Sequence, residues 1–138
     1  FHREGDIDAA YGVRETWSDA LDAPGVSQMI HLKNLMNSKP FTGRIPEQEL
    51  LAENDGEKYD HIAIIRGDDY VFAYTCNGRN ISLKTNVLPW KGYNAKWFDP
   101  KTGGYTSIGS FEVSAREEFN PPGPVANGND RVLILEKK

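Results

Sequence analysis

The chain has 138 residues and a formal net charge of −4 at pH 7. This length suits one ordinary domain, or a smaller domain with an appendage, and is enough to bury a real core. Its one cysteine, Cys76, excludes an intrachain disulfide and a zinc site built on several thiolates. No basic stripe with interleaved aromatics and no apolar run near the ~20 residues of a membrane span occur, so we expect no nucleic-acid partner and no span.

The first clear element is an amphipathic helix over residues 24–37. Apolar residues recur there at positions 26, 29, 30, 32, 35 and 36, which is helical spacing and gives the helix one wide apolar side. Lys39-Pro40 ends it, because the residue before a proline is pushed out of the α region. Upstream, Ser18 caps a predicted single helical turn, and residues 1–16 show no clear periodicity.

A connector follows the helix. Pro40 and Pro46 bracket a short segment, and Pro46 suits the first position of a brief helical turn. Residues 52–60 are polar and contain Gly56. We therefore predict a linker over residues 46–57.

From His61 on, apolar and polar residues alternate with the period of a strand. The runs 61–65 and 70–74, separated by Arg66-Gly67-Asp68-Asp69, predict an antiparallel hairpin. Many short strands with tight turns and no intervening helices predict a mainly β chain, with a C-terminal antiparallel β-sandwich over residues 58–138. The further predicted strands cover residues 80–85, 93–98, 105–113 and 131–136.

Residues 99–103, Asp-Pro-Lys-Thr-Gly, specify the turn of a second hairpin. Asp99 is expected to accept backbone N–H groups, Pro100 presets φ, and Gly103 supplies the positive φ that leads into the next strand. The sequence therefore fixes the register of the two strands that flank this turn.

No catalytic or metal-binding constellation stands out in the sequence. His2, His31 and His61 are dispersed, without neighbours at metal-ligand spacing. The acidic pairs Asp68-Asp69 and Glu117-Glu118 consist of neighbours, which point to opposite faces of a strand and so do not face each other across a substrate. We predict no catalytic residue, no metal and no cofactor in this chain.

Five aromatic residues gather in one stretch, namely Trp90, Tyr93, Trp97, Phe98 and Tyr105. Exposed aromatic rings stack on the apolar faces of sugars, whereas buried ones fill a core. Trp97 and Phe98 alternate faces, so at least one of them is expected in the core. Trp90, Tyr93 and Tyr105 remain candidates for ligand contact.

Several of these features together resemble one family, the bacterial apiosidase-like glycoside hydrolases. In that family a TIM-barrel catalytic domain is followed by a small β-sandwich that carries a collagen-binding name. Tyr11-Gly12, residues 17–25 and Gln28-Met29 are similar to the end of the barrel, where the last strand passes into the last helix. The sandwich resemblance rests on Tyr70-Val71-Phe72-Ala73-Tyr74, Trp97 to Gly103, Phe119-Asn120-Pro121-Pro122 and Asp130 to Leu135.

The resemblance implies three regions. Residues 1–45 would be a remnant of a (β/α)8 catalytic domain, residues 46–57 a linker, and residues 58–138 the accessory sandwich. The family's catalytic acid and nucleophile lie on earlier barrel strands, so this chain would lack both. Tyr11 and Trp17 would lie near the barrel mouth and join the ligand-binding candidates, and the parent protein would be secreted or periplasmic.

Two functions follow as expectations. In the first, the chain is the non-catalytic end of a glycoside hydrolase that acts on plant or host polysaccharide, and its sandwich stabilises the catalytic TIM barrel of the parent chain. In the second, the sandwich is an independent module that binds carbohydrate or a protein such as collagen.

Overall fold

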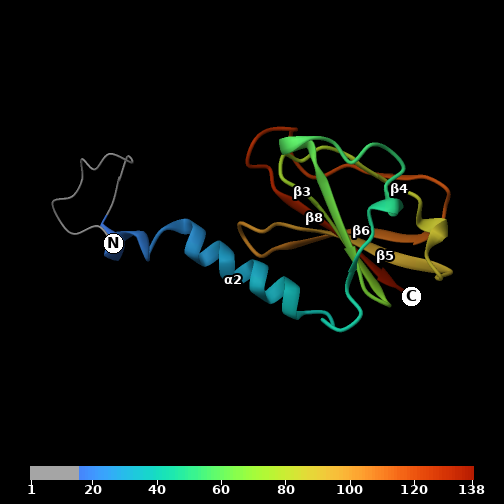
Figure 1. Ribbon diagram of the computed structural model, residues 1–138, viewed down its shortest axis with the longest axis horizontal. Coiled ribbons are helices and arrows are strands. Elements are labelled where there is room, and N and C mark those ends of the chain that lie inside the picture. Colours follow the sequence, from blue (N-terminus) through green and yellow to red (C-terminus); the bar gives the residue numbers. More distant parts are fainter. Residues whose placement is uncertain (1–15) are drawn as a thin grey trace.

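A computed structural model of the protein describes residues 16–138, in which a helix leads into two antiparallel sheets (Figure 1). Within these residues, eight strands, two α-helices and three short 3-10 helices confirm the mainly β fold expected from the sequence. The elements are α1 (Trp17–Ala20), α2 (Pro24–Asn37), β1 (Ile45–Pro46), β2 (Ile62–Arg66), β3 (Tyr70–Thr75), β4 (Ile81–Leu83), β5 (Gly92–Phe98), β6 (Tyr105–Glu112), β7 (Glu117–Phe119) and β8 (Arg131–Lys137).

The larger sheet has the strand order β1-β2-β3-β8-β5-β6, and every neighbouring pair in it is antiparallel. Its centre is β8, the last strand of the chain, which pairs with β3 on one side and β5 on the other (Figure 1). The smaller sheet consists of β4 and β7. The C-terminal strand β8 therefore joins β3 to β5 in the middle of the larger sheet, as its apolar run suggests.

Apolar side chains fill the space between the two sheets. Val71, Trp97 and Leu133 point into this core from the larger sheet, and Ile81 and Phe119 meet them from the smaller one. The opposite face of the larger sheet carries a second buried cluster, made of Leu35, Tyr70, Phe72, Phe98, Val132 and Ile134.

Trp97 and Phe98 show how the two faces divide the aromatic residues. Both are buried, at 4% and 2% exposed, but Trp97 belongs to the core between the sheets and Phe98 to the second cluster. The expectation that at least one of them fills the core is confirmed. Successive side chains of a strand point to opposite faces, and here both faces are covered.

The C-terminal end of α2 covers part of the second face. Leu35 is the buried residue of this helix and joins the second cluster, with Met36 packed beside it. Arg44 fixes the junction, because it donates to the Met36 carbonyl at 2.9 Å and to the Tyr70 hydroxyl at 2.7 Å. Tyr70 in turn donates to the Pro40 carbonyl at 2.9 Å.

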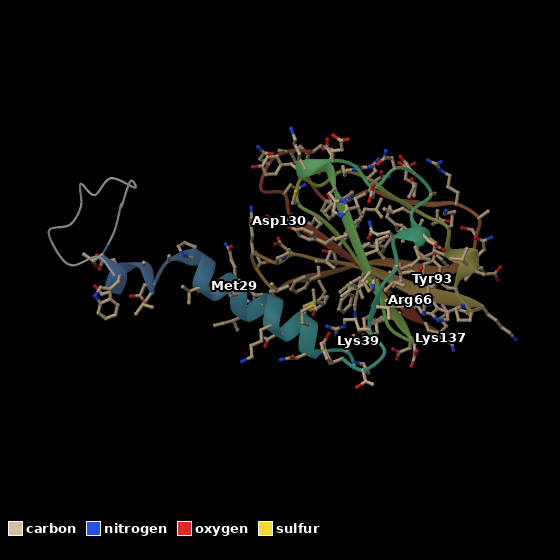
Figure 2. The ribbon with its side chains drawn as sticks, viewed as in Figure 1. Met29, Lys39, Arg66, Tyr93, Asp130 and Lys137 are labelled. Atoms are coloured by element: carbon tan, nitrogen blue, oxygen red, sulfur yellow. The ribbon has the colours of Figure 1, made fainter. Side chains whose placement is uncertain are left out.

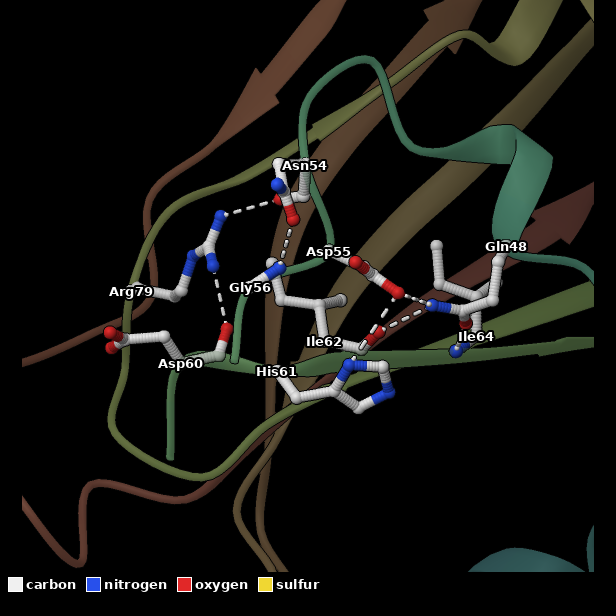
Figure 3. Close-up of polar contacts among 9 residues, drawn as sticks. All are labelled: Gln48, Asn54, Asp55, Gly56, Asp60, His61, Ile62, Ile64 and Arg79. Carbon is white, nitrogen blue, oxygen red and sulfur yellow. Dashed lines mark hydrogen bonds and ion pairs between the residues drawn. The ribbon is translucent and has the colours of Figure 1, made fainter. Parts of the chain in front are cut away.

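The segment predicted as a linker, residues 46–57, is held by hydrogen bonds to the sandwich (Figure 3). The Gln48 amide donates to the Ile62 carbonyl at 2.8 Å and accepts from the Ile64 N–H at 2.6 Å, much as a neighbouring strand would. Leu50 and Leu51, which follow, are buried in the core between the sheets.

The Asp99–Gly103 turn has the structure that its residues predict. The Asp99 carboxylate accepts the Lys101 N–H at 2.8 Å, and Gly103 has a φ of +72°. The turn also reaches α2, because a Cβ atom on Gly103 would lie 2.6 Å from Nδ1 of His31. The hairpin tip and the helix are thus in contact.

Replacing Gly103 with alanine is expected to lower the free energy of unfolding by about 1–2 kcal/mol, because an L side chain is disfavoured at this φ. Contact with His31 adds to the loss, so His31→Ala should recover part of it in the double variant. Gly25→Ala serves as a control of opposite sign, since its Cβ meets nothing within 4 Å in a helix and should raise stability by up to about 1 kcal/mol. Urea denaturation measures the free energy of unfolding of the wild type and the three variants. Equal stability of Gly103→Ala and the wild type would contradict the positive φ assigned to Gly103.

Candidate functional site

The described residues, 16–138, contain no group of three or more His, Cys, Asp or Glu side chains placed to hold a metal ion. Within the same residues, no helix is long and apolar enough to cross a membrane. The candidate sites in this part of the chain are therefore its exposed aromatic, apolar and charged surfaces.

Two of the aromatic candidates lie inside the protein. Trp90 is 6% exposed and donates its indole N–H to the Asp68 carbonyl at 3.0 Å. Tyr93 is fully buried and stacks on Phe111 with ring centroids 5.7 Å apart. Burial raises the pKa of the Tyr93 hydroxyl. Neither ring offers a free face to a ligand in this structure, and both pack in the core between the sheets.

The other candidates differ in their surroundings. Tyr105 is 52% exposed on the second face of the larger sheet, at the start of β6. Trp17 is 55% exposed and lies in α1, far along the chain from the sandwich core. Tyr11 lies outside the described residues. The structure does not bring Trp17 and Tyr105 together with the two buried candidates.

A largely exposed apolar surface runs along α2. Val26, Met29, Ile30 and Leu32 are between 40% and 61% exposed, although helical spacing places apolar residues on one wide side. The helix leaves the sheet and extends away from it toward its N-terminal end (Figure 1). Only its last turns pack on the sandwich.

A groove of about 510 Å³ separates this part of α2 from the sandwich. Met29 and Leu32 line it from the helix, while Pro100 and Val132 line it from the sandwich. Figure 2 shows Met29 on the helix and Asp130 on the sandwich, on either side of this groove. The groove continues the exposed apolar side of α2.

A row of charged side chains crosses the second face of the sheet near Tyr105. Lys39 Nζ lies 2.7 Å from one carboxylate oxygen of Glu136, and Lys96 Nζ lies 2.8 Å from the other. Burial by itself raises the pKa of Glu136, but the hydrogen bonds from Lys39 and Lys96 outweigh it and hold that pKa below its ordinary value of 4.5. Sequence reasoning missed this row, whose only local signal is that Lys96 and Phe98 share a face of β5.

Comparisons with known proteins identify a family and related solved structures. A family model described as "Putative collagen-binding domain of a collagenase" matches residues 45–136, and the chain belongs to this family. A solved structure named "Glycoside hydrolase" is 35% identical, has a TM-score of 0.89, and is matched over 99% of this chain and 30% of its own. A glycoside hydrolase family 5 protein from Bacteroides vulgatus is 37% identical, with a TM-score of 0.84, over 93% and 27% of the two chains. No curated protein matches.

These relatives are larger proteins, because the chain spans only about 30% of the length of the solved structures it matches. The expected kinship to glycoside hydrolases and to the collagen-binding-like sandwich is confirmed at this level. About 70% of each of these two larger proteins therefore lies outside the part that resembles the present chain.

Trp90→Ala is expected to lower the free energy of unfolding by about 3–5 kcal/mol, because it leaves a cavity in the core and removes the bond to the Asp68 carbonyl. Tyr105→Ala should lower it by about 1 kcal/mol or less, since its ring is half exposed. Thermal and urea unfolding compare the two. Similar losses for both variants would contradict the assignment of Trp90 to the core.

The ion pairs of Glu136 predict how stability depends on pH. A carboxylate whose pKa is depressed in the folded state stabilises the fold above its unfolded pKa, and this stabilisation is lost as the pH falls through the folded pKa. The wild type should therefore lose stability below about pH 4.5 more steeply than Glu136→Gln. Urea unfolding from pH 7 to pH 3 measures the difference; parallel curves for the two proteins below pH 4.5 would refute it.

Proposed function

We propose that this chain is the non-catalytic C-terminal part of a glycoside hydrolase, in which the sandwich and α2 pack against the catalytic domain and stabilise it. Residues 1–45 belong to the end of a (β/α)8 barrel in this proposal, and residues 58–138 form the accessory sandwich. Residues 46–57 join the two and contribute Leu50 and Leu51 to the sandwich core. The relatives' greater length and their names support this assignment.

The observation that carries the proposal is the exposed apolar side of α2. Full burial of a Val, Ile, Leu or Met side chain contributes about 1.5–3 kcal/mol, so leaving four of them in water is unfavourable. Contiguous apolar surface of this kind marks an interaction site. A catalytic domain that precedes this chain in the same polypeptide is the natural occupant, because α2 is the element that leads from that side into the sandwich (Figure 1).

The resemblance to apiosidase-like enzymes narrows the proposed activity of the parent protein to plant or host polysaccharides. The catalytic acid and nucleophile belong to the catalytic domain, and this chain supplies neither. The proposal also places the protein outside the cytoplasm, either secreted or periplasmic, where such polysaccharides are found.

The direct test of this function is glycoside release by the intact protein. We expect the full-length protein to release sugars from a panel of plant polysaccharides, and the present chain alone to release none. Absence of any release by the intact protein, with a folded state confirmed by circular dichroism, would overturn the proposal.

The interface is tested by charged substitutions on α2. Met29→Glu with Ile30→Glu in the intact protein should lower its unfolding temperature by several degrees, because the two charges would be placed against an apolar partner. Asn34→Glu on the same helix is the matched control and should leave the temperature unchanged. An unchanged temperature for the double variant would show that this side of α2 remains in water in the intact protein.

An independent binding module for carbohydrate or collagen is the second candidate, and the half-exposed ring of Tyr105 favours it. The family description speaks of collagen, and pull-down with fibrillar collagen tests that half of the alternative directly. Retention of the chain on collagen, lost in Tyr105→Ala, would favour the independent module.

A further inference from the structure

The second face of the larger sheet has an open part that α2 does not cover. Tyr105 of β6, Lys96 of β5 and Glu136 of β8 lie there side by side, and Lys39 joins them from the segment that follows α2. Together with Ser38 they surround a hollow of about 120 Å³, whose apolar wall is formed by Phe72 and Ile134.

The charges around this hollow do not balance. Lys39 and Lys96 share the single carboxylate of Glu136, so the cluster has one surplus positive charge. Each ammonium carries three N–H donors, and Glu136 takes one from each. Donors therefore remain on both lysines for an anionic group in the hollow. The two lysine side chains are only 20% and 32% exposed, which reduces screening by solvent.

Tyr105 provides an aromatic surface next to these donors. Two neighbours contact its ring. The centroids of the Tyr105 and Phe98 rings are 5.0 Å apart, and Lys96 Nζ lies 5.2 Å from the Tyr105 centroid. It nevertheless remains half exposed, since β6 is the edge strand of the sheet. A half-exposed aromatic ring is suited to stacking on the C–H face of a sugar.

A β-bulge sets the position of Lys96. The pairing of β5 with β6 shifts between Ala95 and Lys96, from Ala95 opposite Gly109 to Lys96 opposite Ser107, which leaves Ile108 as the extra residue. Bulges re-aim side chains and are frequent next to functional sites. Beyond the bulge, the Lys96–Ser107 pair lies two residues along the strand from the Phe98–Tyr105 pair, so Lys96 and Phe98 share one face of β5.

We propose that this hollow binds a uronate unit of an acidic polysaccharide. The sugar ring stacks on Tyr105, and its carboxylate accepts hydrogen bonds from Lys96 and Lys39. The choice of a sugar as ligand rests on the proposed function, whereas the requirement for an anionic group follows from the surplus charge. A neutral sugar would leave that charge without a partner.

Binding of trigalacturonate to the full chain, followed by isothermal titration calorimetry, tests the site. We expect the fully methyl-esterified trisaccharide, which keeps the rings but loses the charges, to bind at least ten times more weakly. Equal binding of the ester, or no binding of trigalacturonate, would overturn the proposal. Sulfated dextran oligosaccharides form a third arm, and tighter binding of these would assign the site to sulfate and overturn the uronate assignment.

Variants identify the residues. Tyr105→Ala, Lys96→Met and Lys39→Met should each weaken binding of trigalacturonate at least tenfold, while circular dichroism shows that they remain folded. Tyr59→Ala and Lys91→Met are the matched controls, because both side chains are exposed elsewhere on the molecule, and they should bind as the wild type does. Unchanged binding in Lys96→Met and Lys39→Met, or equal losses in the controls, would refute the assignment.

The two proposals fail separately. Binding of trigalacturonate by this chain does not depend on catalysis, so an intact protein that releases no sugar would overturn the proposed function and leave the binding result in place. Conversely, glycoside release without uronate binding would overturn only the site at Tyr105.

Discussion

The constraint on which this structure depends is that its central sheet is apolar on both faces. Tyr74 is the one residue of β3 that is not buried, and Val132 to Leu135 form a run of four buried residues in β8, so both sides of the sheet need cover. The smaller sheet and the segment with Leu50 and Leu51 cover one side. On the other side the cover is the C-terminal end of α2, which buries Leu35 against Phe72 and Ile134. A helix is therefore a structural part of this sandwich, although it precedes it in the chain.

The same helix has further apolar side chains that the sandwich does not cover. Its final turns pack on the sheet, but Met29 and Ile30, one to two turns earlier, remain exposed. One helix thus presents apolar side chains to two partners, of which the sandwich is one. The relatives, in which the matching part makes up about 30% of the chain, are long enough to contain the other. Unfolding of either domain would expose the apolar side chains of α2 that pack on it, which costs free energy. A shared helix of this kind would therefore couple the stability of the two domains.

Local sequence patterns predicted the helices, hairpins and turns, whereas the candidate site is formed by residues that are distant in the sequence. The helix, the hairpins and the Asp99–Gly103 turn follow from periodicity and turn residues, and all of them are present. Alternation also showed that neighbouring aromatics face opposite ways, but it does not reveal which faces are covered; Trp90 and Tyr93 are buried, and Tyr105 is exposed. The lysine pair around Glu136 joins residues 39, 96 and 136 through the strand order, a property that no window of sequence contains.

Amide hydrogen exchange on α2 tests whether this helix is shared between the sandwich and a catalytic domain. We expect the amides of residues 33–37 to be protected both in the present chain, where Leu35 is buried on the sheet, and in the intact protein. The amides of residues 27–32 should exchange much more slowly in the intact protein than in the isolated chain. Equal exchange of residues 27–32 in the two proteins would contradict the claim.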